Sequence, residues 1–230
     1  MNNDGKIELR RLFSASVIPA FFMALAWLMF AAEGLLNVSL SQYGLMPREI
    51  SHWFGILTMP FLHGGLSHIF ANTVSFIVLG TMLFYFYPEK ALHVFLISYF
   101  FSGIITWLIA SGGVHIGASG MIYAFAAYIF TVGVRSGNIR NMAVSLIIVF
   151  LYGSMVWGLY PQNTGISWEG HLAGAVTGLV CAFIFPIKTE KPESLDDEEV
   201  DDDDYDYNST LDDSDYEIKY HYNSGKNNGK

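Results

Sequence analysis

The sequence has 230 residues, of which 52% are hydrophobic and only 14% are charged. Because a soluble domain of this size carries more charge, the composition indicates a membrane protein in contact with a lipid bilayer. The net charge of −9 arises at the end of the chain, since 15 of the 21 acidic residues lie from Glu190 onward. The preceding residues are close to neutral, which excludes nucleic acid as a partner.

The first apolar run begins at Ser14 and extends to about Leu36, after a polar and basic segment at residues 1–13. At about 1.5 Å per residue, this run is long enough to cross a hydrocarbon core of roughly 30 Å. It has no clear small-x-small cleavage site, so we expect a retained first span and not a signal peptide. Residues 37–60 mix polar residues, glycine and proline with aromatic residues, which is typical of a loop at the membrane interface.

Five further spans are expected after this loop. The segment between Lys90 and Arg135 has no charged residue, and it is about twice as long as one span requires. Ser111-Gly112-Gly113 is the natural break within it. With polar turns at residues 135–140 and 161–165, the pattern predicts six spans: 14–36, 67–86, 91–110, 117–134, the segment from Arg140 to Tyr160, and 170–186.

Six spans place both termini on one side of the membrane, and the cationic residues indicate which side. The termini and the turns after even-numbered spans contain Lys6, Arg10, Arg11, Lys90, Arg135, Arg140, Lys188 and Lys191, whereas the opposite loops contain only Arg48. The positive-inside rule therefore predicts cytoplasmic termini, in a plasma (inner) membrane. The chain divides into a cytoplasmic segment 1–13, a six-span membrane domain 14–187 and an acidic tail 188–230, which we expect to be disordered.

Spans two, four and six begin on the extracytoplasmic side, and each has a polar residue near its start: His68, Ser119 and His171. A polar side chain within a membrane is costly and usually faces the bundle interior or a water-filled cavity. Three such residues at similar depth predict one shared site. Span six also carries Gly170, Gly174 and Gly178 at four-residue intervals, which permits another helix to approach closely.

Close packing of spans four and six would bring the His171 imidazole within hydrogen-bonding distance of Ser119 and form a nucleophile–base dyad. Tyr123, one turn from Ser119, could stack on the imidazole. On span two, His68 and Asn72 are four residues apart and share a face, so both could donate hydrogen bonds to an oxyanion at one place. His63, in the preceding loop, is expected to support this face by packing.

Simpler explanations remain for each residue taken alone. Gly-x-Ser-Gly occurs by chance in apolar helices, where small residues permit close packing, and a single intramembrane histidine is often only a hydrogen-bonding residue. A metal site of His63, His68, His115 and His171 is less favoured, because no acidic ligand or His-Glu-x-x-His motif accompanies these residues. We therefore expect no metal and no cofactor, and an unreactive Cys181 packed among apolar residues.

Three motifs occur in order on spans two, four and six: His63-Gly-Gly-Leu-Ser-His68-Ile-Phe-Ala-Asn72, then Gly117-Ala-Ser119-Gly120 with Tyr123, then Gly170-His171-Leu-Ala-Gly174 with Gly178. By these motifs the chain resembles the rhomboid intramembrane serine proteases, from about Ser14 to Pro186. The resemblance implies an all-α bundle of six transmembrane helices. It also implies Ser119 as nucleophile, His171 as general base, Tyr123 as the stacking ring, and an oxyanion hole of His68, Asn72 and the Ser119 backbone N–H.

The function implied by the resemblance is serine endopeptidase activity on transmembrane segments of other membrane proteins. The alternative is a non-enzymatic rhomboid-like protein that binds client transmembrane helices; such proteins generally lack the Ser–His pair that this chain has. A transporter is a more distant alternative, because the sequence shows no internal repeat. The chain departs from the family at Phe54-Gly55, where many members carry a Trp-Arg pair in the first loop.

Overall fold

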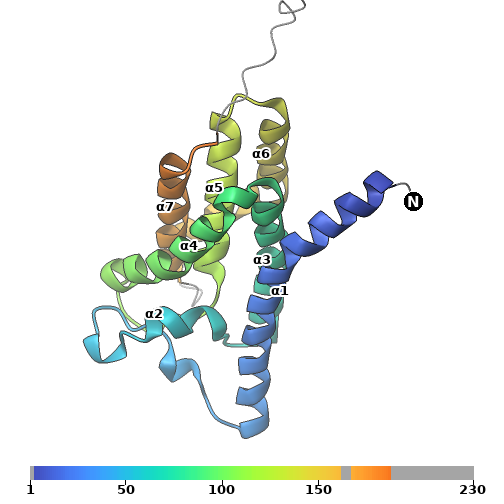
Figure 1. The fold of residues 1–230 in the computed structure, drawn as a ribbon. Coiled ribbons are helices and arrows are strands. Elements are labelled where there is room, and N and C mark those ends of the chain that lie inside the picture. The colour runs from blue at the N-terminus through green and yellow to red at the C-terminus, as the bar shows by residue number, and fades with distance from the viewer. Residues whose placement is uncertain (1–2, 162–166, 188–230) are drawn as a thin grey trace, which may run out of the picture. The chain divides into compact units, whose positions relative to one another are not determined.

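The computed structural model describes residues 3–161 and 167–187, and these residues fold into helices with connecting turns (Figure 1). The α-helices are α1 (Asn3–Leu36), α2 (Gly55–Thr58), α3 (Leu66–Phe86), α4 (Pro88–Ile109), α5 (Ser119–Arg135), α6 (Ile139–Tyr152) and α7 (Trp168–Ile184). Four 3-10 segments accompany them: η1 (Ser41–Tyr43), η2 (Ile50–His52), η3 (Met59–Phe61) and η4 (Gly153–Leu159). The expected disordered tail at 188–230 lies outside the described residues.

Six of the helices correspond to the six predicted spans. Helices α1, α3 and α4, together with the continuous segment Ile139–Leu159, are long and apolar enough to cross a membrane, while α5 and α7 are shorter apolar helices. The prediction of an all-α membrane bundle is therefore confirmed. The additional helix, α2, has only 4 residues and lies in the first loop.

Several helix boundaries differ from those expected, and two of them change how the chain enters a helix. Helix α1 begins at Asn3 and not at Ser14, so the basic N-terminal residues continue the first helix without a break. Good helix formers such as Leu, Glu, Lys and Arg dominate this segment, and Asp4 in the first turn favours the helix N-terminus. Helix α5 begins at Ser119 because Gly117 has a φ of +108°, which is incompatible with an α-helix.

An aromatic cluster forms the core where α1, α3, α4 and α5 meet. Phe76 of α3 stacks on Phe22 of α1 with ring centroids 4.9 Å apart, and it meets Phe125 of α5 edge-on at 5.4 Å. Phe95 of α4 lies stacked against Phe125 at 5.8 Å. Since aromatic rings bury large apolar areas in fixed geometries, this cluster orients four helices relative to one another.

Helices α5 and α7 pack backbone against backbone. A Cβ atom added at Gly174 of α7 would collide with the carbonyl oxygen of Gly120 of α5, and one added at Gly178 would collide with that of Ala124. The glycine spacing in span six thus permits the close approach predicted from the sequence. Both helices are buried along most of their length, and they are the two helices that carry Ser119 and His171.

The first loop packs against α4 and the segment that follows it. The Tyr99 hydroxyl of α4 donates to the Leu57 carbonyl at 2.6 Å, and the Arg48 guanidinium donates to the Ala110 carbonyl at 2.6 Å. A Cβ atom at Gly55 would lie 2.5 Å from the Gly44 carbonyl oxygen, so the position has no room for a side chain. Gly55, which stands where the resemblance would place an arginine, therefore lies in a position that only glycine fits.

Replacement of Gly178 by alanine should destabilise the protein, because the added methyl group must push α5 and α7 apart. We expect a loss of about 1–3 kcal/mol, the usual range for overpacking, seen as a lower Tm in detergent. Gly34→Ala is the matched control, since a Cβ at Gly34 meets nothing within 4 Å. Equal Tm values for the two variants would contradict the close approach.

Candidate active site

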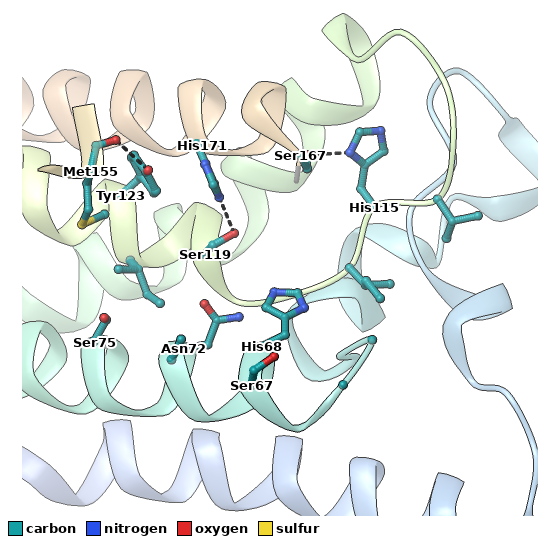
Figure 2. Close-up of a pocket in the computed structure, with 16 residues that line it drawn as sticks. Ser67, His68, Asn72, Ser75, His115, Ser119, Tyr123, Met155, Ser167 and His171 are labelled. Carbon is teal, nitrogen blue, oxygen red and sulfur yellow. Dashed lines mark hydrogen bonds between the residues drawn. The ribbon is translucent and has the colours of Figure 1, made fainter. Parts of the chain in front are cut away.

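A cavity of about 570 Å³ lies between α3, α5, α7 and the loop that precedes α5 (Figure 2). All five residues predicted to form the site line it: His68, Asn72, Ser119, Tyr123 and His171. The structure therefore brings together three segments that are far apart in the sequence.

Ser119 and His171 form a hydrogen bond across the interface of α5 and α7. The distance between Ser119 Oγ and His171 Nε2 is 3.0 Å. Ser119 is the first residue of α5, and His171 lies in the first turn of α7. The contact is possible because Gly120 and Gly174, beside these two residues, let the helix backbones touch.

A backbone carbonyl orients the His171 ring. Its Nδ1 lies 2.9 Å from the Gly158 carbonyl oxygen, which can only accept a hydrogen bond. The neutral imidazole therefore carries its proton on Nδ1 and has a free lone pair on Nε2. That lone pair can accept the Ser119 hydroxyl proton, as a general base requires.

The Tyr123 ring stacks on the face of the His171 ring. The ring centroids are 4.2 Å apart and the planes are inclined by only 12°. The Tyr123 hydroxyl donates to the Met155 carbonyl at 2.7 Å (Figure 2). The stacking predicted from the spacing of Ser119 and Tyr123 is thus present in the structure.

Segment η4 is the part of the site that the sequence pattern does not reveal. It supplies both carbonyl acceptors, Met155 for Tyr123 and Gly158 for His171. A Cβ atom at Gly158 would collide with the Tyr123 hydroxyl and would lie 3.1 Å from His171 Nδ1. Gly158 was the available signal, but within an apolar run it does not reveal that the helix tightens into a 3-10 segment there.

His68 and Asn72 point from α3 toward the turn that leads into Ser119 (Figure 2). A Cβ atom at Gly117 would lie 2.8 Å from His68 Nε2 and 3.3 Å from Asn72 Nδ2. Only glycine fits at this position, because φ is +108° and both side chains approach the backbone closely. The Asn72 Nδ2 donor is buried and has no hydrogen-bond partner among the described residues.

His63 lies behind His68 as a packing residue. Their rings meet edge-on with centroids 4.9 Å apart, and His63 is only 2% exposed. Burial, assisted by the nearby His68, lowers the pKa of His63 to about 4, so its ring is neutral at physiological pH. Among the described residues no group of three or more His, Cys, Asp or Glu side chains is arranged to bind a metal ion.

His115 makes contacts that differ from those of a metal ligand. Its Nδ1 lies 2.6 Å from Ser167 Oγ, and its Nε2 lies 3.0 Å from the Gly112 carbonyl oxygen. Burial lowers the pKa of His115, although Glu169 and the Gly112 carbonyl oppose this shift. The sequence pattern relates His115 only to a possible metal site, and the spacing of the motifs gives no indication of its contact with Ser167.

The six apolar helices around this polar cavity define an integral, multi-pass membrane protein. Residues 50–188 match the family model of the Rhomboid domain, so the chain belongs to the rhomboid family. An uncharacterized protein of Mycobacterium tuberculosis is 31% identical over 183 residues, which cover 76% of each chain. The Bacillus subtilis protein named "Putative rhomboid protease YdcA" is 28% identical over 193 residues, covering 79% of this chain and 93% of its own.

A plant relative matches a shorter part of the chain. RHOMBOID-like protein 1 of Arabidopsis thaliana is 26% identical over 141 residues, which cover 59% of this chain and 35% of the relative.

The His171 tautomer can be tested directly. In protein labelled with ¹⁵N-histidine, solid-state NMR in lipid should show a neutral His171 with its proton on Nδ1, because the Gly158 carbonyl can only accept. A His171→Asn variant, which lacks the signal, provides the assignment. A proton found on Nε2 of the neutral ring would contradict the orientation described above.

Proposed function

We propose that this protein is a serine endopeptidase that cleaves transmembrane segments of other membrane proteins. The observation that supports the proposal most directly is the 3.0 Å contact between Ser119 Oγ and His171 Nε2. The hydrogen bond from His171 Nδ1 to the Gly158 carbonyl also supports the proposal, because it leaves Nε2 free to take a proton. Membership of the rhomboid family agrees with this function.

In the proposed reaction, His171 Nε2 takes the Ser119 hydroxyl proton while Oγ attacks the carbonyl carbon of the scissile peptide bond. The resulting tetrahedral intermediate carries its negative charge on the former carbonyl oxygen. His171 then donates the proton to the leaving amine, and the C–N bond breaks to give an acyl-enzyme. Water attacks the ester with His171 again acting as base, and this step regenerates Ser119 and releases the new carboxyl end.

His68 and Asn72 are proposed to stabilise the oxyanion together with the Ser119 backbone N–H. Asn72 Nδ2 is a buried donor with no partner among the described residues, which is unfavourable in the resting protein. An oxyanion would supply the missing acceptor in the transition state. Stabilisation that arises only at that stage accelerates the reaction, since it does not also stabilise the bound substrate.

The chemistry of the site also limits the form in which a transmembrane substrate can enter. Extended backbone must enter the cavity, because the carbonyls of an intact helix are engaged in hydrogen bonds. We therefore propose substrates whose transmembrane helix unwinds readily near the scissile bond. From the distribution of Lys and Arg, both termini are proposed to be cytoplasmic, in a plasma (inner) membrane, with the cavity open to the extracytoplasmic side.

Ser119→Ala and His171→Ala should each abolish cleavage of a model transmembrane substrate, since a nucleophile and its base both fail when one is removed. Both variants should fold, which a Tm close to that of the wild type would verify. The measurement is the turnover of purified protein reconstituted in liposomes. Substantial turnover by either variant would overturn the proposed dyad.

Labelling by a fluorophosphonate probe separates the proposed enzyme from a non-enzymatic rhomboid-like binder. The probe reacts with activated serines, so wild-type protein should be labelled and Ser119→Ala should not. A wild-type protein that binds transmembrane helices but is not labelled would favour the binder.

Asn72→Ala should lower kcat by about 100- to 1000-fold with little change in KM, because an oxyanion donor acts mainly on the transition state. The measurement is steady-state cleavage in detergent, with Tm recorded for the same sample. An unchanged kcat with a lower Tm would assign Asn72 to packing alone.

A further inference from the structure

Two hydrogen bonds connect the start of α5 to the start of α7 in parallel. Ser119 binds His171, and His115 binds Ser167, and in each pair the partners are 52 residues apart in the sequence. The second pair therefore lies four residues before the first on both segments. Figure 2 shows His115 and Ser167 at one end of the cavity, next to the segment that leads into Ser119.

Ser167 determines where α7, the helix that carries His171, begins. It is the N-cap of α7, because its hydroxyl accepts a hydrogen bond from the Gly170 N–H at 3.1 Å. Its backbone carbonyl accepts the His171 N–H at 3.2 Å. A displacement of Ser167 therefore displaces the turn that carries the imidazole.

His115 belongs to the segment that carries the nucleophile, and this segment is attached to the first loop. His115 exchanges two backbone hydrogen bonds with Leu45, at 2.9 and 3.0 Å. Gly117 donates to the Met59 carbonyl at 2.7 Å. The backbone is thus restrained on both sides of Ile116. A shift of His115 would therefore also shift Ser119.

The tautomer of the neutral His115 ring is the one that its hydrogen bond with Ser167 requires. The Gly112 carbonyl can only accept, so in the neutral ring the proton is on Nε2 and Nδ1 accepts from the Ser167 hydroxyl. That hydroxyl then uses its proton for His115 and a lone pair for the Gly170 N–H, and it completes the cap. His115 is only 7% exposed, so water competes poorly for these bonds.

We propose that His115 and Ser167 are positioning residues whose hydrogen bond sets the separation between Ser119 and His171. The proposal rests on the proposed dyad, and it assigns to His115 no contact with substrate. The glycine contacts between α5 and α7 continue on the far side of Ser119 and His171, and Glu169 accepts a hydrogen bond from the Ser111 hydroxyl at 2.8 Å. These contacts remain when the His115 bond is removed, so the variants should still fold.

The test compares two replacements of His115 in the full-length protein. His115→Phe keeps a ring of similar size but has no acceptor for Ser167. His115→Asn places an amide oxygen close to the position of Nδ1 and so keeps the acceptor. Ser167→Ala and Ser167→Thr test the same bond from the side of α7. Alanine removes the hydroxyl, whereas threonine retains it.

We expect His115→Phe to slow fluorophosphonate labelling of Ser119 and to lower kcat, each by about 10- to 100-fold per folded molecule, with KM nearly unchanged. His115→Asn should recover most of both rates. The double variant His115→Phe/Ser167→Ala should be little slower than the slower of its two single variants, since both remove the same bond.

Wild-type labelling rates in His115→Phe, or equal losses in His115→Phe and His115→Asn, would overturn the proposal. A lower Tm with normal rates per folded molecule would also overturn it, because that result describes a structural residue. Failure of wild-type protein to react with the probe would instead overturn the proposed enzyme function. In that case the ¹⁵N shift of His171 Nε2 still tests the positioning, since the shift should change in His115→Phe and stay near the wild-type value in His115→Asn.

Discussion

The direct backbone contact between α5 and α7 is the constraint on which the rest of the site depends. Gly174 lies against the Gly120 carbonyl and Gly178 against that of Ala124, with no space for a side chain. In a membrane, lipid tails are as apolar as leucine, so close packing replaces the hydrophobic effect as the main force between helices. The same contact brings Ser119 and His171 within 3.0 Å. Small residues here therefore serve both the fold and the polar pair.

No charged side chain among the described residues orients the His171 ring, whose partners are the Gly158 carbonyl and Ser119. A carboxylate inside the bilayer would be costly to desolvate, whereas a backbone carbonyl is already present and neutral. The carbonyls become available because the segment after α6 tightens into the 3-10 segment η4, which contributes Met155 to the lining of the cavity. Irregular backbone at membrane depth is tolerated where it lines such a cavity. One short segment thus aligns both His171, through Gly158, and Tyr123, through Met155.

The loops contribute to the precision of the site as much as the helices do. The first loop pairs with His115 through Leu45 and receives the Gly117 N–H on Met59, so the approach to Ser119 is restrained before α5 begins. Gly117 then passes so close to His68 and Asn72 that no side chain would fit. Gly55 is likewise crowded by the Gly44 carbonyl, so this part of the loop also has no room for a side chain. Arg48 anchors the same loop to the end of α4 through the Ala110 carbonyl.

The sequence by itself determined the all-α membrane class, the six apolar helices and five of the residues that line one cavity. Hydropathy and four-residue glycine spacing are local properties, and the depth of His68, Ser119 and His171 follows from the order of the spans. It did not determine the early start of α1, the carbonyl acceptors in η4 or the contact between His115 and Ser167. Every residue has a carbonyl, so no residue type marks the one that meets an imidazole. Such contacts between distant segments depend on how the helices and loops pack, and only the tertiary structure decides that.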